Sequence, residues 1–142
     1  MITAAKFYRT LGIIVLTLTG CILNSHAEHP IMSEPTGITV TDKDQGGHVQ
    51  LTLGEILTLR LGYIPGTGYS WHIARNNGEL MRPLGEVQYE RSESKLLGAT
   101  EYQIFRFRVL ASGTNILELH YSRPWEKVIA PLKTYRITVQ IR

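Results

Sequence analysis

Leu117-Glu118-Leu119-His120-Tyr121 alternates apolar and polar side chains without a break. Successive side chains of a β-strand point to opposite faces of a sheet, so this alternation places one face of the stretch in a core and the other in water. The stretch therefore predicts a half-buried strand.

The same period of two recurs along most of the chain after residue 36. Turn-forming sequences such as Gln45-Gly46-Gly47 separate the alternating runs, and no run carries a helical period. About eight short strands of this kind predict an all-β fold, an immunoglobulin-like antiparallel β-sandwich. The predicted strands are 38–41, 49–53, 56–63, 71–75, 86–91, 102–110, 115–122 and 135–141.

Within these strands the alternation also predicts which side chains face the core. Leu53 follows Val49 and Leu51 on the apolar side of its run, and Trp71 shares a side with Ile73. Tyr121 has two interpretations, a plain core tyrosine or an analogue of the tyrosine corner of immunoglobulin-like domains.

The N-terminus has the pattern of an export signal. Lys6 and Arg9 precede a short apolar run at 11–18, and Leu18-Thr19-Gly20-Cys21 resembles the lipobox of bacterial lipoprotein precursors. We therefore expect residues 1–20 to be a signal peptide, excluded from the folded domain. Lipidation of Cys21 would anchor the protein in the bacterial cell envelope, on its periplasmic side or at the cell surface.

A second interpretation of the N-terminus remains open. Ser25-His26-Ala27 fits ordinary signal-peptidase cleavage, which would release a soluble periplasmic or secreted protein. A retained membrane helix fits poorly, because the apolar run 11–23 is shorter than the ~20 residues that span a bilayer core.

Residues 21–36 are predicted to be a flexible spacer, and 37–142 a single domain. Cys21 is the only cysteine, so no disulfide forms within the chain. Without Lys6 and Arg9, the mature protein has 13 Lys and Arg against 12 Asp and Glu. A net charge near +1 gives no support for a nucleic-acid partner.

Three connections with distinctive residues are expected at one end of the sandwich, because alternate connections of an up-and-down chain share an end. The first, 64–70, contains Pro65 and two glycines, which allow a tight path exposing backbone amides and a threonine hydroxyl. The second, 92–101, has small residues at its tip. The third, 123–133, opens with Arg123-Pro124-Trp125 and is longer than a minimal hairpin needs.

These three connections resemble the chagasin family of cysteine-peptidase inhibitors, over about residues 38–142. That family carries an Asn-Pro-Thr-Thr-Gly-aromatic-x-Trp loop, a glycine-rich Gly-x-Gly-Gly loop and an Arg-Pro-Trp loop, in that order, on an immunoglobulin-like sandwich. The matching residues are Pro65, Thr67, Gly68, Tyr69 and Trp71, then Gly98, then Arg123, Pro124 and Trp125. The departures are Ile64 for Asn, Gly66 for Thr, and Thr100 and Glu101 for a Gly-Gly pair.

The resemblance implies a reversible inhibitor that occludes the active-site cleft of a papain-like, cathepsin-L-like cysteine peptidase. The implied peptidase-binding residues are Pro65, Gly66, Thr67, Gly68, Tyr69, Gly98, Ala99, Thr100, Arg123, Pro124 and Trp125. Trp125 is expected to be the main anchor and Thr67 to approach the catalytic thiol. Arg123 either contacts the peptidase or bonds to loop carbonyls and Glu126, and Tyr69 either contacts the peptidase or supports its own loop.

Catalysis, cofactors and metals find no support in the sequence. It has no nucleophile motif, no phosphate-binding loop and no His-x-x-x-His pair, and His120 beside Glu118 is expected on a solvated strand face. The rival interpretation is a non-inhibitory binding module of the cell envelope or of adhesion, because an immunoglobulin-like fold by itself does not determine function.

Overall fold

The computed structural model describes residues 36–94, 96 and 98–142, all within the compact unit Met32–Arg142. The predicted signal peptide, the lipidation site and nearly all of the spacer lie outside the described residues. None of the helices in the part of the chain described is long and apolar enough to cross a membrane.

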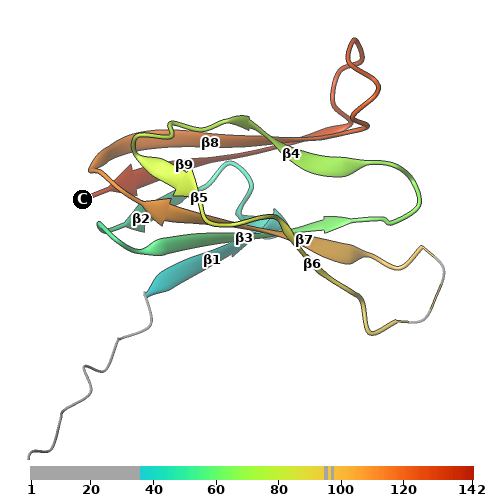
Figure 1. The fold of residues 1–142 in the computed structure, drawn as a ribbon, viewed down its shortest axis with the longest axis horizontal. Helices are drawn as coiled ribbons and strands as arrows, with labels where there is room; N and C mark the ends of the chain where they lie inside the picture. The colour runs from blue at the N-terminus through green and yellow to red at the C-terminus, as the bar shows by residue number, and fades with distance from the viewer. Residues whose placement is uncertain (1–35, 95, 97) are drawn as a thin grey trace, which may run out of the picture. The chain divides into compact units, whose positions relative to one another are not determined.

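Two β-sheets pack face to face (Figure 1). The first has the order β1-β3-β7-β5, with β6 also paired to β7, and the second has the order β2-β9-β8-β4. The strands are β1 (Gly37–Thr41), β2 (His48–Leu51), β3 (Ile56–Tyr63), β4 (Ser70–Arg75), β5 (Met81–Pro83), β6 (Gln88–Glu90), β7 (Glu101–Val109), β8 (Gly113–Ser122) and β9 (Lys133–Ile141). The predicted all-β sandwich is thus confirmed.

The core lies between the two sheets and follows the predicted alternation. Leu117, Leu119 and Tyr121 of β8 are buried, and Trp71 is 5% exposed. The remaining buried apolar side chains are Val40, Leu51, Leu57, Leu59, Leu61, Met81, Phe105, Phe107, Val109, Tyr135, Ile137, Val139 and Ile141. This burial of alternate residues holds the strand ends, and therefore the loops, in fixed positions.

The expectation of an entirely antiparallel sandwich is wrong at two edges. β1 pairs with β3 in parallel, and β2 pairs with β9 in parallel. A short 3-10 helix, η1 (Asp42–Asp44), follows β1 before the chain continues in the other sheet as β2. Apolar alternation is the same in parallel and antiparallel pairs, so the sequence pattern carries no information about this choice.

Three further differences concern residues that the alternation placed in strands. The predicted strand 86–91 is shorter in the structure, where it is β6. In addition, β5 forms a short strand on the same edge of β7. Leu53 is 57% exposed, because β2 ends at Leu51 and the chain turns, with Gly54 at a φ of 84°. Ile73 is also largely exposed, beside an irregularity in the pairing of β4 with β8.

Candidate functional site

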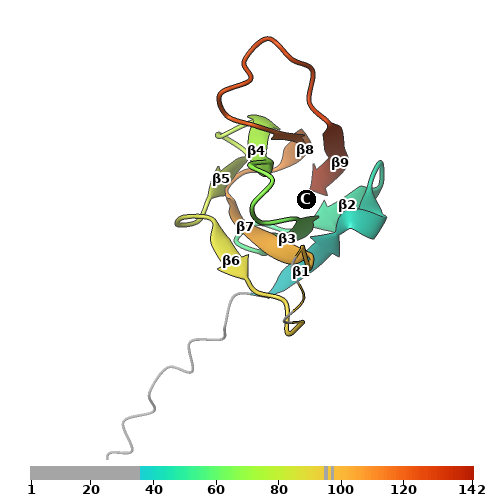
Figure 2. The ribbon, with the colours of Figure 1, turned by 90° about the vertical axis from the view of Figure 1, so that its right-hand side faces the viewer.

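Three loops meet at one end of the sandwich, as the sequence predicts. The first (64–69) joins β3 to β4, the second (91–100) joins β6 to β7, and the third (123–132) joins β8 to β9. Figure 1 shows all three on the same side of the sheets, and Figure 2 looks onto that end, with the first loop between the other two.

Hydrogen bonds to core residues hold the first loop both where it leaves β3 and where it enters β4. The Tyr121 hydroxyl accepts a hydrogen bond from the Ile64 amide at 3.3 Å, and the Trp71 indole donates to the Gly62 carbonyl at 3.0 Å. The Trp71 amide donates to the buried Gln103 side chain at 2.7 Å. Trp71 is therefore a core residue, as predicted, and it also positions the loop.

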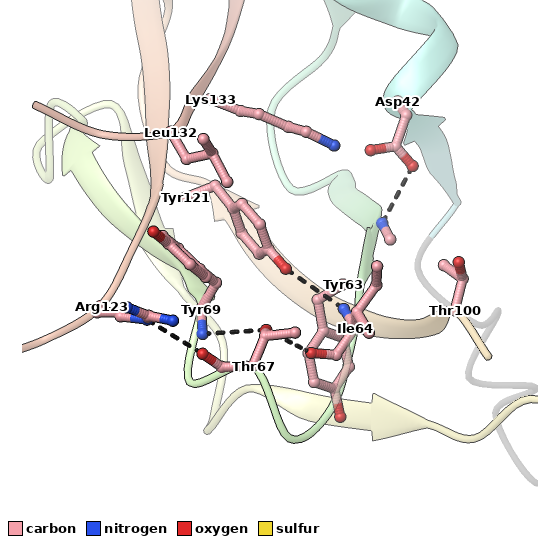
Figure 3. Close-up of a pocket in the computed structure, with 11 residues that line it drawn as sticks. Asp42, Tyr63, Ile64, Thr67, Tyr69, Thr100, Tyr121, Arg123, Leu132 and Lys133 are labelled. Carbon is pink, nitrogen blue, oxygen red and sulfur yellow. Dashed lines mark hydrogen bonds between the residues drawn. The ribbon is translucent and has the colours of Figure 1, made fainter. Parts of the chain in front are cut away.

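Inside the first loop, Thr67 uses its hydroxyl to hold the turn. Thr67 Oγ1 donates to the Ile64 carbonyl at 2.8 Å and accepts from the Tyr69 amide at 3.4 Å (Figure 3). The glycines on either side have φ values of 82° at Gly66 and 79° at Gly68, a region that other residues rarely adopt. Thr67 is exposed, as the sequence predicts, and its hydroxyl is engaged in these bonds within the loop.

Arg123 of the third loop bonds to the first loop and to its own. Its Nε donates to the Thr67 carbonyl at 3.1 Å, and its Nη1 donates to Glu126 Oε1 at 3.1 Å. The guanidinium lies over the Tyr69 ring, 4.5 Å from the centroid. Of the two interpretations that the sequence leaves open, the structural one therefore describes this conformation (Figure 3).

Trp125 combines high exposure with a defined contact. Its side chain is 66% exposed, and its indole lies directly against Gly68. A methyl group added at Gly68 would lie 2.5 Å from Trp125 Cη2, closer than non-bonded carbon atoms approach in proteins. Gly68 therefore both allows the turn and leaves room for the indole, a double role that the sequence does not reveal.

A row of aromatic rings connects the loops to the core. Tyr69 stacks on Tyr121 with ring centroids 5.4 Å apart, and Tyr121 lies 5.0 Å from Trp71. Trp71 in turn meets Tyr135 edge-on at 6.4 Å. Such pairs add about 0.5–1.5 kcal/mol each beyond the area that they bury. Tyr69 thus supports the first loop, and Tyr121 behaves as a core tyrosine whose hydroxyl fixes that loop.

The comparison with protein families decides what kind of loop cluster this is. Residues 50–139 match the family described as "Chagasin family peptidase inhibitor I42". The chain belongs to the chagasin family. It is therefore a member of a family of peptidase inhibitors rather than of enzymes.

Individual members of the chagasin family are similar over most of the domain. Chagasin of Trypanosoma cruzi is 33% identical over 89 residues, which cover 61% of this chain and 81% of chagasin. Amoebiasin-2 of Entamoeba histolytica is 27% identical over 103 residues, covering 72% of this chain and 84% of amoebiasin-2.

Solved structures confirm the fold. The crystal structure of the cysteine protease inhibitor EhICP2 from Entamoeba histolytica superposes with a TM-score of 0.69 at 24% identity, covering 78% of this chain and 99% of that one. PbICP-C, solved in complex with falcipain-2, has a TM-score of 0.51 at 17% identity, with 75% of this chain and 99% of that one covered. Both of those chains are covered almost completely, so each of them consists of this fold.

The second loop shows how this chain departs from the chagasin pattern. Gly98 has a φ of 78° in open space, and the Ala99 amide donates to the Leu96 carbonyl at 3.2 Å. The sequence places Glu101 at the end of this loop, but Glu101 begins β7 and accepts a hydrogen bond from the Tyr63 hydroxyl at 3.0 Å. Burial and this bond raise the pKa of Tyr63. The Glu101 carboxylate is thus engaged in this hydrogen bond at the start of β7.

A cleft of about 540 Å³ opens at the loop end (Figure 3). It is lined by Asp42, Gly62, Tyr63, Ile64, Thr67, Tyr69, Thr100, Tyr121, Arg123, Leu132 and Lys133. The Thr100 methyl lies close to Gly62, at 3.0 Å from where a Cβ would stand, so the second loop contacts the strand that leads into the first.

His120 and Glu118 form an ion-pair cluster. His120 Nε2 lies 2.9 Å from Glu118 Oε1, and Arg136 Nε lies 3.1 Å from Glu118 Oε2. Both carboxylate oxygens are therefore engaged by neighbouring cations or donors. Over the residues that the structure describes, no group of three or more His, Cys, Asp or Glu is placed to hold a metal ion.

Proposed function

We propose that this chain is a reversible inhibitor of papain-like cysteine peptidases and that its three loops occlude the active-site cleft. The proposed contact residues are Pro65, Gly66, Thr67, Gly68 and Tyr69 of the first loop, Gly98, Ala99 and Thr100 of the second, and Arg123, Pro124 and Trp125 of the third. Membership in a family of peptidase inhibitors supports the activity, and the clustering of the loops supports the surface.

The observation that carries the proposal is the bracing of the first loop by the third. Arg123 and Trp125 hold the first loop through its Thr67 carbonyl and its Gly68 Cα. A braced loop loses little conformational freedom when it enters a cleft, which leaves more of the contact energy for binding. Trp125 then presents a large, positioned aromatic surface of the kind that dominates interface energies.

The same bonds explain why the first loop would resist cleavage. A peptidase cuts an extended segment whose carbonyl is free to enter the oxyanion site. Here the Ile64 carbonyl accepts from the Thr67 hydroxyl, and the Thr67 carbonyl accepts from Arg123. Two positive-φ glycines keep the backbone away from an extended path. The loop is therefore held in a shape that a substrate does not take.

The test uses the protein from residue 22 onward, without a lipid. Competitive inhibition of papain is expected, with no effect on trypsin or thermolysin, and intact mass should be unchanged after long incubation with the peptidase. Leu53→Ala is the matched control for Trp125→Ala, because Leu53 is 57% exposed at the opposite end of the sandwich. Absence of inhibition of papain-like enzymes at micromolar protein would instead favour a non-inhibitory binding module.

We also propose that Cys21 carries the lipid that holds the inhibitor in the bacterial cell envelope. The support is the basic n-region followed by Leu18-Thr19-Gly20-Cys21. Cys21→Ala is expected to block lipid-dependent processing and to move the protein from the membrane to the soluble fraction. A mature N-terminus at Glu28 would instead show cleavage after Ala27, and membrane association unchanged by Cys21→Ala would contradict the anchor.

A further inference from the structure

We propose that the end of the sandwich opposite the three loops binds the surface of an anionic phospholipid membrane. The protein surface involved, called the base below, comprises Leu53 and Leu110 beside the strand ends and Arg82, Arg106 and Arg108 on the adjoining outer face of the first sheet. The inference relies on the proposed anchor at Cys21 for its biological setting. Its test does not require the anchor, because the base is part of the folded domain.

The register of the first sheet brings the arginines together. Arg82 of β5 lies directly opposite Arg108 of β7, and Arg106 is two residues further along the same face of β7. Their neighbours Met81 and Val109 are buried, so alternation turns the three arginines to the outer face, where all are exposed. Directly opposed side chains of antiparallel strands have Cβ atoms ~5 Å apart.

The three arginines are not in ion pairs within the described part of the chain, although Glu86 lines a pocket together with Arg106. Glu55, at the nearby turn, directs its carboxylate to the amide of Thr52 at 2.7 Å. Two like charges directly opposite on neighbouring strands destabilise a sheet. An arginine pair of this kind is thus suited to an anionic partner.

Apolar side chains beside the arginines favour a membrane over a soluble polyanion. Leu53 is 57% exposed at the tip of the turn between β2 and β3, and Leu110 is 43% exposed just after β7. The two segments adjoin, because the Gly54 amide donates to the Val109 carbonyl at 3.2 Å. Phospholipid headgroups attract arginines, and the acyl boundary accepts leucines. An acidic polysaccharide attracts arginines but has no apolar region for leucines.

The base lies beside the start of the first strand, β1, and this position bears on how the domain would be oriented at a membrane. Gly37 lies opposite Ile56, and Ile56 lies opposite Arg108, so the start of β1 shares a cross-strand row with the arginine pair. The loops lie at the other end of the same strands (Figure 1). Segment 21–36 has 16 residues, and a chain of that length spans at most about 55 Å. A tether of that length does not by itself fix the orientation of a domain. Contact of the base with the membrane would supply that orientation.

The test measures vesicle binding by the protein from residue 22 onward, which contains no cysteine and has no lipid. Co-sedimentation with vesicles of phosphatidylcholine and phosphatidylglycerol is expected, with weak or no binding to phosphatidylcholine alone and a marked loss at 1 M NaCl. Each arginine at an anionic surface contributes a factor of about five. The triple variant Arg82→Gln, Arg106→Gln, Arg108→Gln should therefore bind at least ~10-fold more weakly.

A matched triple variant controls for net charge. Lys43→Gln in η1, Arg91→Gln in the second loop and Lys127→Gln in the third loop remove the same charge outside the base, and this variant should keep most of the vesicle binding. Leu53→Asn, which leaves the net charge unchanged, should also weaken vesicle binding relative to the parent protein. Neither triple variant should lower the melting temperature, and the base variants should inhibit papain as the parent does, so failure here is separable from failure of the proposed inhibition.

A fluorescence measurement tests the orientation. An environment-sensitive dye on Leu53→Cys should brighten on anionic vesicles, whereas the same dye on Val128→Cys, at a site 99% exposed in the third loop, should not. Three results would overturn the inference: no binding of the parent protein to anionic vesicles, equal losses in the two triple variants, or binding to dextran sulfate without binding to vesicles.

Discussion

Gly68→Ala is the most discriminating single substitution at the loop end. Gly68 has a φ of 79°, and its Cα faces the Trp125 indole. Gly66, two residues earlier, has a φ of 82°, but a methyl group added there would meet nothing within 4 Å. Alanine at either site is strained by about 1–2 kcal/mol, because Cβ crowds the following carbonyl in this region. Only alanine at Gly68 also meets the indole.

The extra effect at Gly68 comes from displacing Trp125. The added methyl would lie 2.5 Å from Trp125 Cη2, where ordinary carbon contacts begin near 3.4 Å, so the ring must move by about 1 Å. The indole is 66% exposed and can swing outward at little cost to stability. It would then leave the position from which it anchors the inhibitor. Loss of an anchor costs about 2 kcal/mol of binding free energy, or roughly thirtyfold.

Inhibition constants for papain and melting temperatures of both glycine variants provide the assay. Both variants should lose similar stability, while Gly68→Ala should weaken inhibition at least ~10-fold more than Gly66→Ala. In a Trp125→Ala background that difference should disappear. Equal inhibition constants for the two glycine variants, or a difference that persists without the indole, would refute the bracing of the first loop by Trp125.

Trp125→Ala alone should weaken papain inhibition about thirtyfold and leave the melting temperature nearly unchanged; a matching loss of stability would mean that the exposed indole is a structural residue. Trp71→Ala should reduce the free energy of unfolding by about 3–5 kcal/mol in urea titrations, because it empties a core site and removes the indole's hydrogen bond to Gly62; a loss below ~1 kcal/mol would contradict that role. Arg123→Lys should raise the inhibition constant while keeping the fold, since lysine offers a single nitrogen where arginine uses two, Nε for Thr67 and Nη1 for Glu126; unchanged inhibition would show that the paired geometry is dispensable. Replacing Thr100 and Glu101 by a Gly-Gly pair should lower the melting temperature through loss of the Tyr63 bond, and calorimetry showing no change would contradict the importance of that bond.

Local pattern is sufficient to predict the strands and most of the core. Alternation in 115–122 and 135–141 identifies β8 and β9, and the position of Trp71 at the start of a strand predicts its burial. Alternate connections of an up-and-down chain share an end, so the order of the strands alone predicts that the three loops lie together. These features follow from a period that can be read within a few residues.

The contacts that define the loop end were decided by tertiary structure. Arg123 reaches Thr67, 56 positions earlier, and Trp125 covers Gly68, although nothing in either local sequence names its partner. The Arg-Pro-Trp stretch marks an unusual loop, yet two roles for Arg123 are equally consistent with it. The pairing of β4 with β8, in which Ser70 lies opposite Ser122, brings the first and third loops within hydrogen-bonding distance.

The sequence pattern likewise does not predict how the edge strands pair. The alternation in β1 and β2 is compatible with parallel or antiparallel neighbours, and it counts Leu53 as an inward residue although the chain turns just before it. The arginine pair at Arg82 and Arg108 arises from register across β5 and β7, strands that are far apart in the chain. The sequence by itself determined which side chains alternate, whereas the pairing of the strands determined which side chains meet, because alternation is a local property and register depends on the whole fold.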